Sequence, residues 1–282
     1  MPDCLNCRRA VPDHVRNCPY CQTDVGFPNV RAASQKIETE ALNERFKNAL
    51  VSARARKCEE ILLDFGNAAA RSSAVISRSL SAIQTLVSSE RALYISFYRQ
   101  VESGSRLPED NAWDRGRLAV DSTLFPLYHP EIVFAALSLD GLGPHSYGTY
   151  TIILRENMIL QRATVFEENS FSFCQAKHKI VVGDPIPPGY RAQWDSRGLI
   201  AMAKLHDKLE SSTTKEEYPG ILLTQNPDPT AEDFIEVHIY GPIHRAAIER
   251  IKGPLPKSRE DKVILRSIKK KLDEIGAVAE FD

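Results

Sequence analysis

The sequence predicts an α+β fold in three parts: a small metal-binding segment at residues 1–28, a long helical connector at 29–105 and an α+β domain at 106–282. Three observations support this prediction. Two CxxC pairs stand at the start, apolar residues then recur at helical spacing, and short β-branched and aromatic runs follow. Because these runs never alternate regularly with helical patterns, a doubly wound parallel sheet is disfavoured.

The first part depends on four cysteines, arranged as two CxxC pairs that are separated by ten residues. Each pair fits a tight knuckle, so the four thiolates predict a tetrahedral site for a structural Zn²⁺ ion, with the ligands Cys4, Cys7, Cys18 and Cys21. Residues 4–26 resemble the small zinc-ribbon domains that begin many bacterial proteins. Disulfides are the alternative, which a cytoplasmic location disfavours. We expect the two other cysteines, Cys58 and Cys174, to be buried apolar side chains.

Composition and charge describe an ordinary globular chain. Of 282 residues, 43% are hydrophobic and 26% are charged, with a formal net charge of −1. No apolar run reaches the roughly 18 residues of a membrane span, and the N-terminus lacks the basic and apolar segments of a signal peptide. We therefore expect a cytoplasmic protein with no membrane association. Residues 244–271 are rich in Arg and Lys, which predicts either a solvated helix face or a surface for phosphate backbones.

The middle part shows amphipathic periodicity over residues 30–103. Apolar residues recur mostly at three- to four-residue steps, first at residues 37–65 and again at 75–87. This pattern predicts two or three helices that pack as a bundle against the C-terminal domain; a coiled coil that self-associates is the alternative. The stretch at residues 102–110 contains Gly, Ser and Pro and predicts a loop at the domain boundary.

The last part is expected to hold short strands and helices that are separated by loops rich in Gly and Pro. Residues 132–139 predict a short helix, because they follow a His-Pro pair. Strands are predicted at residues 145–154, 164–166, 221–224 and 234–241, and helices at 199–209 and 258–275. No GxGxxG or P-loop motif occurs, so neither nucleotide-binding fingerprint applies.

The strand predicted at residues 234–241 carries an informative polar face. Side chains alternate in a strand, so Glu236, His238 and Tyr240 share one face, while three apolar residues form the other. A carboxylate beside an imidazole is costly to bury without partners. This face is therefore a candidate site, and the alternative is a surface pair worth about 0.2–1 kcal/mol.

Several short segments together resemble the core of bacterial ADP-ribosyltransferase-like toxins. They are residues 145–148 (HSYG), 162–164 (RAT) with 168–170 (ENS), and 234–241 (FIEVHIYG). The resemblance covers about residues 124–251. It implies a mixed sheet that is split around a cleft, in which three strands meet a nicotinamide dinucleotide.

The resemblance also implies roles for individual residues. His145 would hold the ribose, Ser170 would support the nicotinamide side, and Glu236 would act on the ribose under attack, with NAD as the substrate. Tyr147 is placed to stack on nicotinamide. Breaking the nicotinamide bond builds positive charge on the ribose carbon, which a carboxylate stabilises. On the same strand face as Glu236, His238 or Tyr240 is placed to orient the incoming acceptor, and His238 is the residue we assign to this role.

These expectations describe an NAD-dependent ADP-ribosyltransferase, a toxin or defence effector that modifies nucleic acid or protein and is restrained by an inhibitory partner protein. The family often has Gln or Glu two residues before its catalytic Glu, and Phe234 at that position leaves the acceptor class open. One alternative is a non-enzymatic zinc-ribbon scaffold that binds nucleic acid or protein. Another is a metal-dependent nuclease built on Glu236, His238 and His244, although the histidine spacing matches no standard ligand geometry.

Overall fold

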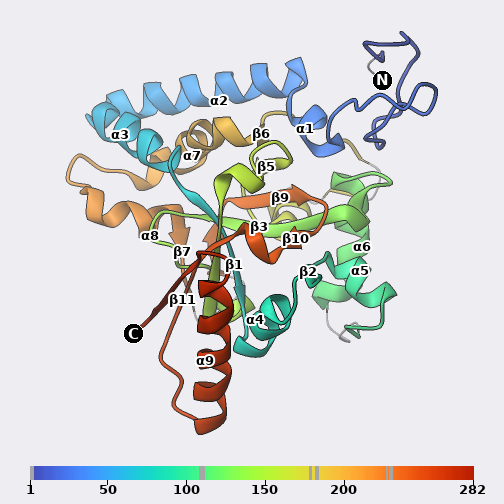
Figure 1. The fold of residues 1–282 in the computed structure, drawn as a ribbon. Helices are drawn as coiled ribbons and strands as arrows, with labels where there is room; N and C mark the ends of the chain where they lie inside the picture. Colours follow the sequence, from blue (N-terminus) through green and yellow to red (C-terminus); the bar gives the residue numbers. More distant parts are fainter. Residues whose placement is uncertain (1–2, 108–111, 178–179, 182–183, 227, 229–230) are drawn as a thin grey trace.

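The computed structural model describes residues 3–107, 112–177, 180–181, 184–226, 228 and 231–282. Within these ranges the chain forms a mixed α+β structure around one large mixed sheet, and the cysteine-containing segment lies at one end of it (Figure 1). The α+β fold class predicted from the sequence is therefore confirmed.

Eight strands form the main sheet, and neighbours run antiparallel except for the parallel pair β11–β12. In spatial order, the strands are β12 (Val278–Phe281), β11 (Ile248–Gly253), β4 (Tyr150–Leu154), β1 (Ser73–Arg78), β3 (Ile132–Ser138), β9 (Glu236–Tyr240), β5 (Ala163–Phe166) and β6 (Arg191–Gln193). Two small antiparallel pairs accompany this sheet: β2 (Leu93–Tyr94) with β10 (Ile243–His244), and β7 (Leu223–Thr224) with β8 (Asp233–Phe234).

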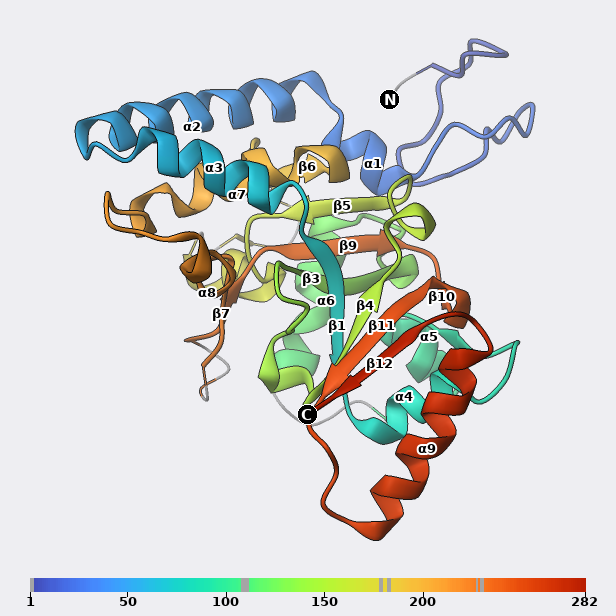
Figure 2. The ribbon, with the colours of Figure 1, turned by 60° about the vertical axis from the view of Figure 1, so that its left-hand side comes forward.

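The main sheet forks between β1 and β3. Residues 73–75 of β1 pair with residues 136–138 of β3. Beyond this short contact β1 continues along β4, whereas β3 continues along β9. We call β12, β11, β4 and β1 the first arm and β3, β9, β5 and β6 the second arm. In Figure 2, strands β1, β4 and β11 of the first arm run at a steep angle to β5 and β9 of the second.

Two segments predicted as helix are strands at this fork, so both predictions were wrong. β1 lies inside the predicted helical connector, and β3 occupies the short helix predicted at residues 132–139. The four residues 74–77 are all buried, and a strand buried on both faces shows no alternation of polar and apolar residues. Because β1 pairs with both β3 and β4, the boundary predicted between residues 105 and 106 does not divide the sheet.

Helices pack on the two arms from different sides (Figure 1). The helices α2 (Lys36–Ala55), α3 (Glu59–Ala69) and α7 (Arg197–Leu205) pack on one another beside the second arm. The helices α4 (Leu80–Val87) and α9 (Arg259–Asp273) pack together beside the first arm. The buried faces of all five helices belong to one hydrophobic core, so their apolar stripes are used within the chain.

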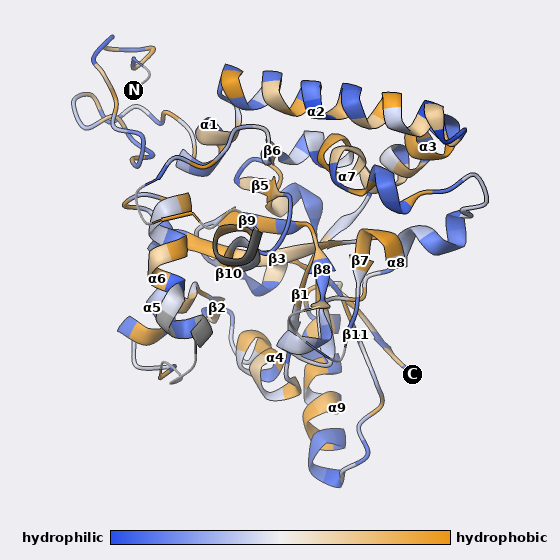
Figure 3. Cartoon of the chain, turned by 180° about the vertical axis from the view of Figure 1, so that it is seen from behind, coloured by the Kyte–Doolittle hydropathy of each residue, from blue (hydrophilic) through white to orange (hydrophobic). Residues whose placement is uncertain are grey.

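The described residues form four further α-helices: α1 (Pro28–Ala33), α5 (Phe97–Glu102), α6 (Ala112–Leu124) and α8 (Tyr218–Leu222). Figure 3 shows apolar strands β3 and β9 at the centre of the molecule, with polar stretches along the outer helices. Among the helices of the described ranges, none combines the length and the apolar character that crossing a membrane requires.

Buried polar contacts attach α2 to the second arm. The Glu38 side chain, which is 2% exposed, accepts hydrogen bonds from the Gly189 amide at 2.7 Å and from Arg191 Nε at 2.6 Å. Arg45 pairs with Glu167. A buried ion pair is stabilising only when its remaining hydrogen-bonding groups are also satisfied. For the pair of Glu38 and Arg191, the hydrogen bond from the Gly189 amide meets part of this requirement. The predicted connector is therefore an integral part of the sheet structure.

Candidate functional site

The four cysteines of the N-terminal segment, residues 3–26, lie together, and we call this segment the ribbon. Their sulfur atoms are all within 4.8 Å of one another, with Cys4–Cys21 and Cys7–Cys18 distances of 3.6 Å. Four sulfurs at about 2.3 Å from a tetrahedral Zn²⁺ ion would lie roughly 3.8 Å apart. The donor set therefore fits the predicted zinc ion in both chemistry and spacing.

Two turns with the same geometry position these sulfurs. The residue after each CxxC pair, Arg8 or Gln22, has a positive φ of 59° or 60°. Its amide donates to the carbonyl of the first cysteine of its pair, Cys4 at 2.8 Å or Cys18 at 2.9 Å. A side chain other than glycine adopts this left-handed conformation only where the surroundings stabilise it. The repeated turn is consistent with a metal knuckle.

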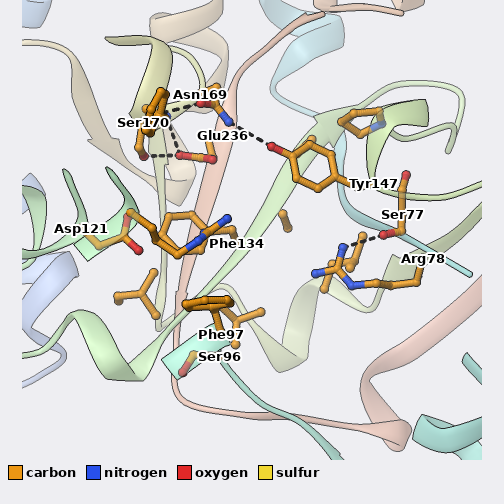
Figure 4. A pocket seen from close by; sticks show the side chains of 18 of the residues that line it. Ser77, Arg78, Ser96, Phe97, Asp121, Phe134, Tyr147, Asn169, Ser170 and Glu236 are labelled. Carbon is orange, nitrogen blue, oxygen red and sulfur yellow. Dashed lines mark hydrogen bonds between the residues drawn. The ribbon is translucent and has the colours of Figure 1, made fainter. Parts of the chain in front are cut away.

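A cavity of about 410 Å³ opens at the fork of the sheet. Its walls include residues 76–78 of β1 and 132–136 of β3, which diverge beyond their short paired contact. Helices α5 and α6, the 3₁₀ turn η2 (His145–Tyr147) and the loop at residues 169–171 supply further walls. The polar side chains that face one another across this space are shown in Figure 4.

Glu236 lies on the cavity wall in direct contact with Ser170 and His238. The Ser170 amide donates to Glu236 Oε2 at 3.0 Å, and the Ser170 hydroxyl donates to the same oxygen. His238 Nε2 lies 2.9 Å from Glu236 Oε2 and 3.2 Å from Ser170 Oγ. All three residues are buried. None of these contacts uses Glu236 Oε1, so one carboxylate oxygen is held by protein while the other is left for a ligand.

His238 lies behind Glu236 and does not line the cavity. It is 2% exposed, and the rings of Phe125, Phe134 and Phe166 surround it at centroid distances of 4.7, 5.3 and 5.5 Å. An imidazole in this apolar enclosure can hold the carboxylate but cannot reach an incoming acceptor. The geometry therefore supports a positioning role for His238 in place of the acceptor contact predicted from the sequence.

The turn η2 separates two residues that were predicted to act together. Residues 145–147 form a 3₁₀ turn, and β4 begins only at Tyr150, so His145 and Tyr147 do not share a strand face. His145 is exposed and does not line the cavity. Tyr147 does line it, and its hydroxyl accepts a hydrogen bond from Asn169 Nδ2 at 3.2 Å. The structure thus brings Tyr147, but not His145, to Ser170 and Glu236.

The residues of the proposed nuclease site do not form a metal site. His244 lies on β10, where its Nε2 is 2.6 Å from the Glu90 carbonyl oxygen. Within the described ranges, the ribbon cysteines are the one group of His, Cys, Asp or Glu side chains close enough together to hold an ion. Nothing in this geometry supports metal-dependent cleavage by Glu236, His238 and His244.

Three arginines in the cavity wall were not identified from the sequence. Arg78 ends β1, and Figure 4 shows its guanidinium directed toward the space that Glu236 and Tyr147 border. Burial lowers the pKa of Arg78 to about 10, which still leaves it cationic at neutral pH. Arg106 and Arg117 lie near the ring of Phe97, at 4.7 and 4.8 Å from its centroid. Arg106 and Arg117 also lie 3.5 and 3.7 Å from the Asp114 carboxylate, so the suitability of this part of the cavity for an anionic ligand depends mainly on Arg78.

The sequence contains a local signal for Arg78, but the segment that contains it was predicted as helix and is a strand. A buried strand that ends in Ser77 and Arg78 is followed at once by Ser79, whose side chain accepts from the Ala82 amide and caps α4. Polar residues between a strand and a capped helix commonly belong to sites. Because the strand was taken for helix, this signal could not be used.

Asp121, on α6, is a second carboxyl group in the same cavity. It is 3% exposed, and its Oδ2 accepts a hydrogen bond from the Tyr98 hydroxyl at 2.9 Å. Burial raises the pKa of Asp121 to about 7, and the nearby Glu236 carboxylate adds to this rise, whereas Arg117 and Tyr98 oppose it. The cavity therefore contains two carboxyl groups with different environments.

Comparison with known proteins adds no relationship to these observations. No protein-family model matches the sequence, and a search among curated proteins gives no match either.

Proposed function

We propose that this protein is an NAD-dependent ADP-ribosyltransferase that uses Glu236 to transfer ADP-ribose to a macromolecular acceptor. The observation that carries the proposal is the direct contact between Ser170 and Glu236 on the wall of a cavity at the fork of the sheet. These residues lie 66 positions apart in the chain. Nothing in the local sequence required the two residues that the resemblance assigned to one site to be in contact.

The forked sheet supports the same proposal. The resemblance to ADP-ribosyltransferase-like toxins implies a sheet split around a cleft, and the two arms diverge beyond residues 73–75 of β1 with the cavity between them. A mixed sheet with a cavity between its two arms agrees with the sheet that this resemblance implies. A nucleotide-binding parallel sheet would instead place its ligand beyond the carboxyl ends of parallel strands.

Glu236 has the chemistry that this reaction needs. As the bond between nicotinamide and ribose breaks, positive charge develops on the ribose C1′ atom, and a fixed carboxylate stabilises that charge. Ser170 and His238 hold Oε2, so Oε1 is oriented toward the sugar, where it can accept a hydrogen bond from the 2′-hydroxyl group. Holding the carboxylate in advance avoids reorganisation during the reaction.

Arg78 supplies a phosphate contact, which differs from the ribose contact that the sequence suggested for His145. A dinucleotide carries two phosphates, and Arg78, Arg106 and Arg117 supply cationic groups in the cavity wall. Guanidinium groups bind phosphate oxygens through paired hydrogen bonds. We therefore place the phosphates toward the arginines and the nicotinamide end toward Tyr147, Ser170 and Glu236.

Release of nicotinamide from NAD tests the proposal. Wild-type protein is expected to release nicotinamide, and Glu236→Gln is expected to lower the rate by about 10²–10³-fold, as is typical for loss of one electrostatic group in an active site. His145→Gln is the matched control, since the side chain is exposed and lies outside the cavity wall, and it should keep the wild-type rate. Wild-type protein that neither binds NAD nor releases nicotinamide would overturn the proposal.

A binding role for the ribbon is favoured by its exposed tips. Leu5 is 100% exposed and Tyr20 is 57% exposed, one on each knuckle, and the Arg9 guanidinium lies 4.8 Å from the centroid of the Tyr20 ring. We propose that these tips bind the acceptor. A Leu5→Ser, Tyr20→Ser variant should then lose acceptor modification and keep nicotinamide release, whereas a purely non-enzymatic scaffold would show no release in any variant.

A further inference from the structure

The cavity is lined by a second carboxyl group, that of Asp121, to which the proposed binding of NAD assigns no role. Asp121 lies on the same wall region as Glu236, and Figure 4 shows both side chains on one side of the space, opposite Arg78. An acid that is 3% exposed is expected to have a partner for its charge. The hydroxyl of Tyr98 provides one hydrogen bond and Arg117 a nearby positive charge, but the carboxyl group also lines the cavity that a substrate would enter.

The groups that face Asp121 come from four elements. Tyr98, on α5, donates its hydroxyl at 2.9 Å, and its ring packs against His129 at a centroid distance of 4.7 Å. Arg117 lies one turn earlier on α6 and stabilises the negative charge, while Glu236 on β9 destabilises it. Cys174 is a further titratable neighbour, and burial, together with the negative charges of Glu236 and Asp121, raises the pKa of that thiol, which therefore stays protonated at neutral pH.

Resting on the proposed function, we infer that Asp121 is the general base that removes a proton from a hydroxyl nucleophile as it attacks the ribose C1′ atom. The bond from C1′ to nicotinamide breaks, and its electron pair leaves with neutral nicotinamide. A bond forms between C1′ and the nucleophile oxygen, and the proton of that hydroxyl moves to the Asp121 carboxylate. The acceptor is thus a group with a proton to lose, such as an alcohol or water, in contrast to a carboxylate.

Two features of the site divide the work between the carboxyl groups. Glu236 is held at Oε2 by Ser170 and His238, so it is oriented for the sugar and not free to turn toward an acceptor. Asp121 lies in a less polar environment, and its pKa of about 7 matches that of an effective base near neutral pH. Different environments for two carboxyl groups in one cavity are the usual basis for separate acid–base roles.

The pH dependence of the reaction has a definite sign. Asp121 acts as the carboxylate, so the rate should be level above a pH of about 7 and fall below it as this group is protonated. The hydrogen bond from Tyr98 lowers the pKa of Asp121, because it stabilises the charged form. Loss of this bond should therefore move the fall in rate to higher pH.

Hydrolysis of NAD provides the test, with water as the nucleophile and nicotinamide release measured from pH 5.5 to about 9. Asp121→Asn should lower the plateau rate by about 10²-fold and remove the fall below neutral pH. Tyr98→Phe, whose hydroxyl lies outside the cavity wall, should keep the plateau rate within a few fold and shift the fall to higher pH.

Each outcome has a separate meaning. An Asp121→Asn variant with the wild-type rate and pH profile would overturn the role of Asp121 while leaving the proposed function intact. If Asp121→Asn fails to fold, the Tyr98→Phe profile decides, because an unshifted fall in rate would equally overturn the inference. Wild-type protein that neither binds NAD nor releases nicotinamide would overturn the proposed function and this inference together.

Discussion

The ribbon and the cavity assemble their functional side chains in opposite ways. In the ribbon, all four sulfur ligands come from residues 4–21, and two turns of the same geometry hold them. In the cavity, Arg78, Asp121, Ser170 and Glu236 come from four distant segments that only the forked sheet brings together. Sequence spacing can therefore reveal the first kind of site directly, whereas the second depends on knowing which strands are neighbours.

The two regions also differ in what stabilises them. The ribbon buries little more than Val11 and two of its cysteines, so a metal ion held by the four sulfurs would supply most of its folding free energy. The sheet that forms the cavity is stabilised by a large hydrophobic core and by buried polar contacts between distant segments. Removing the ion should therefore affect one region alone, and breaking a long-range contact should affect the other.

Loss of zinc should produce the largest effect. Binding of structural zinc is worth about 10–16 kcal/mol in small domains, so chelation or Cys18→Ser should unfold residues 3–26. Hydrogen exchange should report this loss as rapid exchange of the Gln22 and Arg8 amides, which are bonded within the knuckles. Nicotinamide release should stay within about twofold of wild type, since no ribbon residue lines the cavity.

Elemental analysis supplies the control for this prediction. Wild-type protein should contain one zinc per chain, and Cys58→Ala should keep it, because Cys58 is buried in the main core away from the cluster. Purified protein without zinc, or a chelator that melts the main sheet together with the ribbon, would contradict the division into two independent regions.

The sequence was sufficient for those features whose partners are close in the chain. The CxxC spacing predicted the cysteine cluster, and alternation over residues 234–241 placed Glu236 and His238 on one face of a strand, where they are found in contact. Amphipathic periodicity likewise predicted α2 and α3, and a helix was predicted at residues 258–275, where α9 lies. In each case a short-range pattern carries the physical constraint.

The sequence was insufficient where tertiary burial overrides the pattern. Residues 73–78 and 132–138 are buried on both faces at the centre of the sheet, and their apolar runs resemble helix as much as strand. Missing β1 also hid Arg78, which ends it. His145 was misplaced because its role rested on a short motif, and a 3₁₀ turn replaces the start of the strand that this motif was expected to open.

A long-range contact should give the next largest effect. Glu38→Gln removes the charge that pairs with Arg191 and leaves this partly buried guanidinium without its counter-ion, which should destabilise the fold by about 3 kcal/mol. Chemical denaturation of zinc-loaded protein measures this change. The effect should appear in the main sheet, because Glu38 connects α2 to residues 189–191.

A matched pair in the ribbon provides the comparison for Glu38. Asp24 pairs with Arg16 at 2.9 Å, but both side chains are exposed to solvent. Asp24→Asn should therefore change stability by less than about 1 kcal/mol. Equal effects of Glu38→Gln and Asp24→Asn would show that burial does not make the contact of Glu38 stronger than the exposed ion pair of the ribbon.

Gly148 offers a smaller and more local change at the cavity. Its φ of 142° is rarely adopted by other residues, and a Cβ atom there would lie 2.3 Å from the backbone carbonyl carbon of Arg78. Gly148→Ala should therefore push η2 away from the end of β1 and destabilise the protein by about 1–3 kcal/mol. Because Arg78 and Tyr147 flank this contact, nicotinamide release should fall as well.

Gly220, within α8, is the control for this substitution, because a Cβ atom there meets nothing within 4 Å. Gly220→Ala should leave the melting temperature unchanged or raise it slightly, since alanine favours helix over glycine. A Gly148→Ala variant that melts like wild type but releases nicotinamide slowly would place the effect in the cavity alone. A variant with unaltered stability and unaltered release would show that the contact between η2 and β1 does not shape the site.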